Sequence, residues 1–195
     1  GNIVQKTDPL GGVTRYTYDA RGNKLSETDP LGNTVTYTYD SKDNLLSRTD
    51  ALGNRVEYTY NSRGQVLTIT DASGNVTTNT YDANGNLIST TDPLGFVTTY
   101  EYDTAGNLVK MTDSLGGVTL YTYDAAGNMI SKTDPLGNVI TYTYDANGNK
   151  LSETTTRTTP SGIPETITTR YVYDKANRLV QTIDPYGNTT TIEYN

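Results

Sequence analysis

The chain repeats itself with a period of 21 residues, and this period constrains the fold more than any other feature of the sequence. The repeated element is a Tyr-x-Tyr-Asp box, and every tyrosine except Tyr186 lies in one. The eighth box comes 29 residues after the seventh, and a partial box, Ile192-Glu-Tyr194-Asn, follows it. A fixed period of this length is typical of proteins that stack one supersecondary unit many times. The box residues are Tyr16, Tyr18, Asp19, Tyr37, Tyr39, Asp40, Tyr58, Tyr60, Tyr81, Asp82, Tyr100, Tyr102, Asp103, Tyr121, Tyr123, Asp124, Tyr142, Tyr144, Asp145, Tyr171, Tyr173 and Asp174, with Asn61 and Asn79 as substitutions.

Each repeat carries two turn signals. One follows the box, as in Asp19-Ala-Arg-Gly22, and the other is an Asp-Pro-Leu-Gly segment such as Asp29 to Gly32. An aspartate at the first position can accept hydrogen bonds from amides ahead of it, and glycine adopts the positive φ that such turns need. Proline presets φ at the second position. Two turns in each repeat leave room for two strands of roughly five to seven residues.

The segments between the turns have the alternation of strands. Val35, Tyr37 and Tyr39 fall on one face and the intervening threonines on the other. The return segment carries one aliphatic residue at an equivalent position of each repeat, and no segment has helical periodicity. We predict an all-β fold of tandem antiparallel β-hairpin repeats that form a continuous curved or spiralling sheet. The aliphatic residues are Leu25, Leu46, Leu67, Ile88, Val109, Ile130, Leu151 and Val180.

We expect residues 1–195 to be one array of about eight repeats, in which tyrosine supplies the core. Only 33% of the residues are hydrophobic, whereas the chain has 17 tyrosines and a single phenylalanine. We therefore expect the box rings to be mostly buried between neighbouring hairpins, together with the aliphatic residues. In the alternative interpretation, the rings are exposed and stack on sugars.

The charge and the absent residue types exclude several classes of function. A formal charge of -7, with the basic residues scattered, disfavours nucleic acid and anionic membrane surfaces. The sequence has neither Cys nor His, so thiolate metal sites and the commonest general base are missing. No apolar run approaches the ~20 residues of a membrane span. The absence of a signal peptide at the start fits a trimmed piece of a longer protein.

The repeated aspartates could suggest calcium or acid–base catalysis. Each turn offers one carboxylate, however, whereas calcium sites gather several oxygen ligands. A glycosidase needs one distinct pair of carboxylates, and here every repeat has the same acids. We expect the aspartates to cap turns, and we predict no catalytic residues, no cofactor and no metal.

One segment breaks the period. Between Leu151 and Tyr171 the expected Asp-Pro-Leu-Gly turn is replaced by a longer Thr-rich stretch, so that residues 154–169 form an extended hairpin. This hairpin is either a projecting contact loop or a neutral insertion, which hairpin tips tolerate. The candidate contact residues are Arg157, Pro160, Gly162, Ile163 and Pro164.

The composite pattern Gly-Asn-x-Leu, Thr-Asp-Pro-x-Gly and Tyr-x-Tyr-Asp-x-x-Gly resembles the YD repeat (Rhs repeat) along the whole chain. This family includes Rhs and wall-associated bacterial toxins, the encapsulating subunits of Tc toxins, and teneurins. The resemblance implies a hollow β-shell, often one that encloses a toxin domain. The aspartate-containing core region that releases the toxin in the family has no counterpart here, and the Asp-Pro-Leu-Gly segments are ordinary repeat turns.

Three functions follow from these observations. The first is a non-enzymatic structural segment of the shell or stalk of a secreted or cell-surface bacterial toxin, with neighbouring repeats and an enclosed toxin domain as partners. The second is an adhesin-like module that binds a glycan or a protein. The third is an array that self-associates end to end through its open terminal strands.

Overall fold

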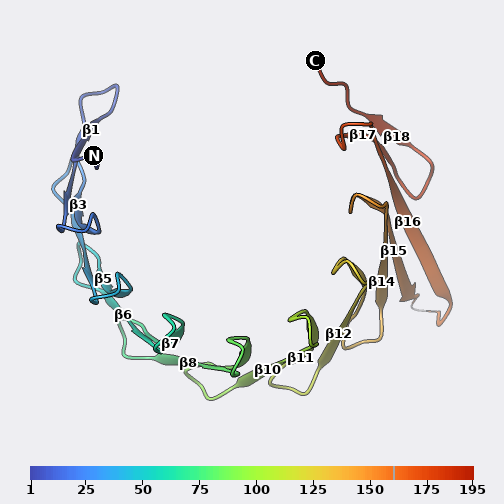
Figure 1. Ribbon diagram of the computed structural model, residues 1–195, viewed down its shortest axis with the longest axis horizontal. Helices are drawn as coiled ribbons and strands as arrows, with labels where there is room; N and C mark the ends of the chain where they lie inside the picture. The colour runs from blue at the N-terminus through green and yellow to red at the C-terminus, as the bar shows by residue number, and fades with distance from the viewer. Residues whose placement is uncertain (160) are drawn as a thin grey trace. The chain divides into compact units, whose positions relative to one another are not determined.

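The protein is all-β, as the sequence predicts. The computed structural model describes residues 1–159 and 161–195, and strands account for more than half of them (Figure 1). Within this described part of the chain there is no helix, and thus none long and apolar enough to cross a membrane. The strands are β1 (Gln5–Thr7), β2 (Val13–Tyr18), β3 (Lys24–Thr28), β4 (Thr34–Tyr39), β5 (Leu45–Thr49), β6 (Arg55–Tyr60), β7 (Val66–Thr70), β8 (Val76–Tyr81), β9 (Leu87–Thr91), β10 (Val97–Tyr102), β11 (Leu108–Thr112), β12 (Val118–Tyr123), β13 (Met129–Thr133), β14 (Val139–Tyr144), β15 (Lys150–Thr158), β16 (Pro164–Tyr173), β17 (Leu179–Ile183) and β18 (Thr189–Thr191).

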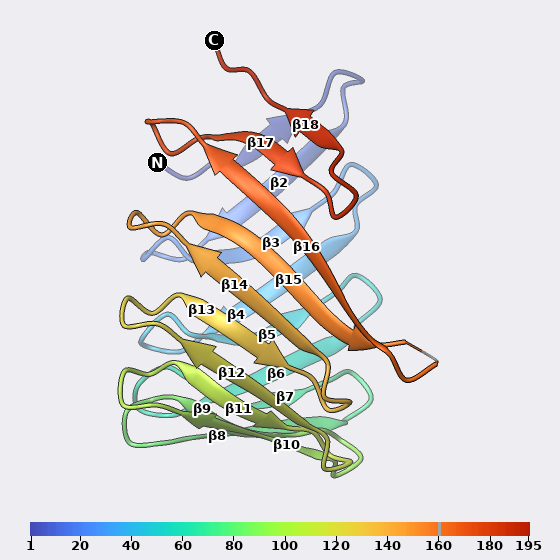
Figure 2. The same cartoon turned by 90° about the vertical axis from the view of Figure 1, so that its right-hand side faces the viewer.

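The strands fall into two compact units, Gly1–Val97 and Thr98–Asn195. Within the first unit, β1 to β9 pair in chain order, each antiparallel to the next. Within the second unit, β10 to β18 do the same, as the successive hairpins in Figure 2 show. Each unit is therefore a meander of consecutive hairpins, which confirms the tandem-hairpin prediction.

The two hairpins of a repeat differ by a β-bulge. Where the box strand pairs with the strand after it, the register shifts at the second tyrosine, so that Thr38 pairs with Ser47 but Tyr39 pairs with Leu45. The other hairpin, which contains the Asp-Pro-Leu-Gly turn, keeps a regular register, as in Ser47 opposite Glu57. A bulge adds one unpaired residue to a strand and increases its local twist. Here that residue is the recurrent aliphatic one, Leu46.

The two turn signals form the same turn, although their sequences suggested two kinds. In both, the aspartate N–H donates to the carbonyl of the fifth residue, and the fourth residue donates back to the aspartate carbonyl. The distances are 3.0 and 3.1 Å for Asp19, and 2.9 and 3.0 Å for Asp29. Gly22 and Gly32 have φ angles of 93° and 88°, a region that favours glycine. Proline therefore stiffens one set of turns without changing their geometry.

Side chains alternate between a half-buried tyrosine face and a more exposed threonine face, as in β4 and β6. The expectation of mostly buried tyrosines is met only in part, because the box rings are half-buried, Tyr194 is exposed, and no apolar side chain among the described residues is fully buried. Leu25 and Leu46 of the expected aliphatic ribbon are 38% exposed. The reason is that each unit is one layer of sheet, with no second layer to cover either face.

Candidate functional site

The second tyrosine of a box reaches back to the preceding repeat. Tyr60 Oη donates to the Leu45 carbonyl at 2.7 Å. This carbonyl lies beyond the last pair of the β5–β6 ladder, Ser47 with Glu57, so β6 contacts it through the tyrosine side chain. The hydroxyl therefore adds a hydrogen bond beyond the end of the ladder. Equivalent bonds join Tyr18 to Ile3, Tyr39 to Lys24, Tyr81 to Val66, Tyr123 to Leu108, Tyr144 to Met129 and Tyr194 to Leu179.

The first tyrosine of the box packs against a lysine in several repeats. Lys24 Nζ lies 5.7 Å from the Tyr16 ring centroid and 5.0 Å from the Tyr37 ring centroid, so one lysine spans two repeats. It also makes a 2.6 Å ion pair with Glu27, and this hydrogen bond raises the pKa of Lys24 above its usual value. Cation–π contacts of this kind hold adjacent rings together.

The same cluster recurs in the second unit. Lys150 Nζ lies 5.5 and 4.9 Å from the ring centroids of Tyr142 and Tyr171, and 2.7 Å from Glu153. The Lys150 cluster joins the long hairpin to the strand before it, so the ladder of rings continues across the break in the period.

The substitution of Asn79 for tyrosine in the fourth repeat does not leave polar groups without partners. Asn79 Nδ2 donates to the Val66 carbonyl at 3.2 Å, beside the 2.9 Å bond from the Tyr81 hydroxyl. Thr90 Oγ1 donates to Asn79 Oδ1 at 3.0 Å. Hydrogen bonds therefore replace the ring contacts that this position lacks.

The repeated aspartates cap their own turns. Asp29 Oδ1 accepts the N–H groups of Leu31 and Asn33 at 2.9 and 2.8 Å, and Oδ2 accepts the Asn33 amide at 2.7 Å. Asp19 makes the equivalent bonds in the turn after the box. Both carboxylate oxygens are engaged within the turn, which is the capping role that the sequence predicts.

These hydrogen bonds favour the ionised carboxylate. The Asn33 side-chain amide, followed by backbone amides, holds the pKa of Asp29 below its usual value. The pKa of Asp19, Asp40, Asp82, Asp103, Asp124 and Asp145 is lowered for the same reason, and the Arg178 backbone and side chain lower that of Asp174. No three metal-ligating side chains gather anywhere in the part of the chain that is described.

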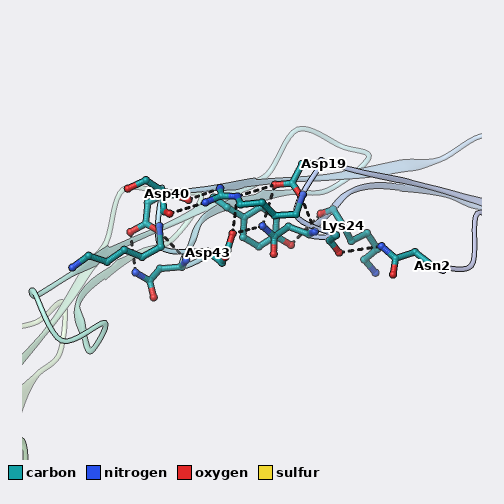
Figure 3. Close-up of polar contacts among 12 residues, drawn as sticks. Asn2, Asp19, Lys24, Asp40 and Asp43 are labelled. Carbon is teal, nitrogen blue, oxygen red and sulfur yellow. Dashed lines mark hydrogen bonds and ion pairs between the residues drawn. The ribbon is translucent and has the colours of Figure 1, made fainter.

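Side chains also join successive box turns, a feature that the sequence analysis missed. Arg21 donates from NH1 to the Ser41 carbonyl at 2.6 Å and from NH2 to the Asp40 carbonyl at 2.9 Å. Its Nε lies 3.0 Å from Asp43 Oδ1, which also accepts the Asn23 amide at 2.5 Å. Figure 3 shows this network between the turn of Asp19 and the turn of Asp40 and Asp43.

The same position of several later repeats also joins successive box turns. Lys42 Nζ donates to the Ser62 carbonyl at 3.0 Å, and Arg63 Nη2 donates to the Ala83 carbonyl at 2.6 Å. The equivalent residues in the following repeats are Asn84, Ala105, Ala126 and Asn147, of which Asn147 Nδ2 donates to Asn177 Oδ1 of the next box turn at 3.1 Å. The sequence signal for this network is the row of basic residues at the third turn position, 21 residues apart.

The long hairpin ends in the same kind of turn, with threonine replacing aspartate. Thr159 N–H donates to the Ile163 carbonyl at 2.9 Å, and the Ile163 N–H donates to Thr159 Oγ1 at 3.1 Å. Ile163 is 63% exposed, and Gly162 and Pro164 are also exposed. Arg157 lies in β15, and Pro160 lies outside the described residues.

Comparison with known proteins gives the class of this architecture. The sequence matches the family described as the teneurin YD-shell over residues 11–190, so the chain belongs to the YD-shell family. No curated protein matches the chain. The family assignment agrees with the resemblance drawn from the Tyr-x-Tyr-Asp boxes.

Solved structures show the same fold in Tc toxin proteins. The crystal structure of TcdB2-TccC3-Cdc42 matches with a TM-score of 0.71 at 21% identity, and that of TcdB2-TccC3-TEV with 0.72 at 22%. The Photorhabdus luminescens Tc holotoxin pore matches with 0.71 at 22% identity. Each comparison covers 98% of this chain but only 12% of the other, so the chain spans about one eighth of those proteins.

Proposed function

We propose that the chain is a structural, non-enzymatic segment of the β-shell of a secreted or cell-surface protein of the bacterial Rhs-toxin type. The observation that carries this proposal is the uniformity of the repeats. The tyrosine hydroxyl bond and the aspartate cap recur from repeat to repeat in the same geometry. A wall needs this kind of regularity, whereas an active site needs one position that differs from the others.

The contacts between neighbouring repeats are those expected of a continuous β-shell. The Tyr60 hydroxyl crosses from one repeat to the backbone of the previous one, and Lys24 contacts rings of two repeats. We propose that residues 1–195 act as one array on this basis, with neighbouring repeats as the principal partners of each hairpin. The family match and the Tc toxin structures support a shell that would enclose a toxin domain.

The carboxylates support a role without catalysis. The carboxylates of Asp29 and Asp19 each accept three hydrogen bonds within their own turns, and the pKa of both is lowered. A general acid requires a carboxyl whose pKa is raised toward neutrality. None of the aspartates whose pKa is shifted meets that requirement.

Measurements of shape and ligand binding test the proposal. Small-angle scattering of residues 1–195 should give a curved monomer at low protein concentration, because consecutive twisted hairpins coil. End-to-end filaments in electron micrographs at that concentration would favour a self-assembling array instead. A reproducible hit on a glycan array, lost when Tyr100 or Tyr121 is replaced by alanine, would favour the adhesin-like alternative.

A further inference from the structure

A row of leucines stands exposed along one edge of the sheet in each unit. In the first unit, Leu10, Leu31, Leu52 and Leu94 occupy the third position of successive Asp-Pro-Leu-Gly or Asp-Ala-Leu-Gly turns, and they are 80% to 97% exposed. Leu115, Leu136 and Tyr186 hold this position in the second unit, with similar exposure. We call these residues the leucine edge. Single exposed leucines are common on protein surfaces, but here they recur at one position of successive turns along one edge.

The turn itself does not need leucine. In the first unit this position is once occupied by serine, at Ser73, and the turn is unchanged. Ser73 N–H donates to Asp71 Oδ1 at 2.8 Å, as Leu52 N–H does to Asp50 Oδ1 at 2.9 Å. Gly74 and Gly53 close the two turns with bonds of 3.0 Å. The leucine side chain therefore adds nothing to the turn that serine does not supply.

The opposite edge confirms that the apolar character is specific to one side. The box turns have the same hydrogen-bonding pattern, yet their third position holds Arg21, Lys42, Arg63, Asn84 or Ala105. Because identical turns carry leucine on one edge and polar or small residues on the other, turn formation does not explain the difference.

The spacing of the leucine edge identifies what fits it. Successive leucines are two strands apart, or about 9.6 Å at the ~4.8 Å separation of paired strands. A gap of this size takes one side chain, which then lies about 4.8 Å from the leucine on either side. A partner must therefore present apolar side chains singly and at the same interval. A second leucine edge does so, displaced by half a repeat.

We propose that the leucine edge is a docking surface for the leucine edge of a second copy of this chain, with the two rows interdigitated about a twofold axis. Such an isologous contact uses the same patch on both copies. It differs from end-to-end addition, because it leaves the terminal strands free, and it does not depend on the shell function. Each tip also carries a carboxylate, such as Asp29 or Asp50, so salt should strengthen the contact by screening the repulsion between two acidic rows.

Sedimentation equilibrium of residues 1–195 tests the proposal, with the triple variant Leu31→Ser, Leu52→Ser and Leu94→Ser. Serine is chosen because Ser73 shows that it preserves the turn. The unaltered chain should form dimers whose Kd falls as NaCl rises from 0.05 to about 0.5 M, and the triple variant should raise Kd at least tenfold. Circular dichroism and melting temperature should stay unchanged.

A matched control is the pair Ala105→Ser and Ala126→Ser, which alters the opposite edge and should leave Kd unchanged. A single-cysteine variant, Leu52→Cys, should also form a disulfide-linked dimer in mild oxidant, whereas Ala105→Cys should not. The proposal is overturned if the unaltered chain stays monomeric to millimolar concentration at high salt, or if the triple variant dimerises equally well. Flotation of the monomeric chain with vesicles of a neutral phospholipid would instead assign the edge to a lipid surface.

Discussion

The Tyr60 hydroxyl donates a 2.7 Å hydrogen bond to the backbone carbonyl of Leu45, fifteen residues earlier and in the preceding repeat. The bond lies beside the β-bulge, where the register shifts at Tyr39 and Leu45, and beyond Ser47, where the next ladder ends. The second box tyrosine is thus a backbone partner as well as a ring, which explains why tyrosine rather than phenylalanine recurs.

Replacing Tyr60 by Phe should lower the free energy of unfolding by about 1 kcal/mol, the usual net value of one hydrogen bond. The matched control is Tyr58→Phe in the same box, because no hydrogen bond joins the Tyr58 hydroxyl to another of the described residues. Urea unfolding of the two variants measures the difference. Equal losses in both would mean that the hydroxyl bond contributes nothing to stability.

The sequence predicts the fold of this chain well because its period and alternation are strictly local signals. The Tyr-x-Tyr-Asp box and the Gly at most fourth turn positions suffice to place strands and turns. The burial of the tyrosines could not be predicted, because it depends on whether a second layer covers the sheet. The contacts of Arg21 with Ser41 and Asp40 were also missed, since they depend on how one turn lies against the next.

Low pH should destabilise the protein. The folded-state pKa of several capping aspartates, among them Asp29, Asp50 and Asp71, is lowered, so each of these contributes stability that is present above the unfolded-state pKa, near 3.8. That stability is lost as pH falls from about 4 through the folded-state values. The melting temperature should therefore stay constant from pH 7 to about 5 and fall steeply below 4.

The third repeat offers the control for this pH dependence. Asn61 holds the capping position there, and its Oδ1 accepts the N–H groups of Arg63 and Gln65 at 2.9 and 3.1 Å. The variant Asp40→Asn should therefore keep its turn and show a smaller loss of melting temperature between pH 5 and pH 3. An unchanged acid transition would show that Asp40 is not among the groups that drive it.

Removal of the network between box turns should have a modest effect. Arg21→Ala deletes two hydrogen bonds to carbonyls and an ion pair with Asp43, all at an exposed site, so we expect a loss of about 0.5 kcal/mol. The converse change, Ala126→Arg, introduces arginine at the equivalent position of the second unit and should raise stability by a similar amount. Chemical denaturation at 0.05 and 0.5 M NaCl measures both changes, and high salt should weaken the ion-pair part.

Chelation should leave stability unchanged. The aspartates meet their hydrogen-bonding needs within their turns, and one carboxylate in each turn does not assemble the several oxygen ligands that calcium requires. The melting temperature should be the same in EDTA and in millimolar calcium. A drop of several degrees in EDTA that calcium reverses would assign the turns to a metal.

The long hairpin should be dispensable for folding. Its strands β15 and β16 pair from Ser152 with Arg170 to Thr158 with Pro164, and its tip lies past the ends of its neighbours in Figure 2. Four extra residues in each strand extend it by roughly 13 Å. Removing Thr155–Thr158 and Pro164–Ile167 keeps every remaining side chain on its own face, because an even number leaves each strand. It also retains the turn that begins at Thr159 and leaves Thr154 opposite Thr168.

The shortened chain should give the same circular dichroism spectrum and a melting temperature within a few degrees of the original. If it folds but loses binding or association, the tip around Gly162 and Ile163 is an interaction site, and if nothing changes, the tip is a neutral insertion. Failure to fold would contradict the prediction and place Ile167 among the residues that stabilise the sheet.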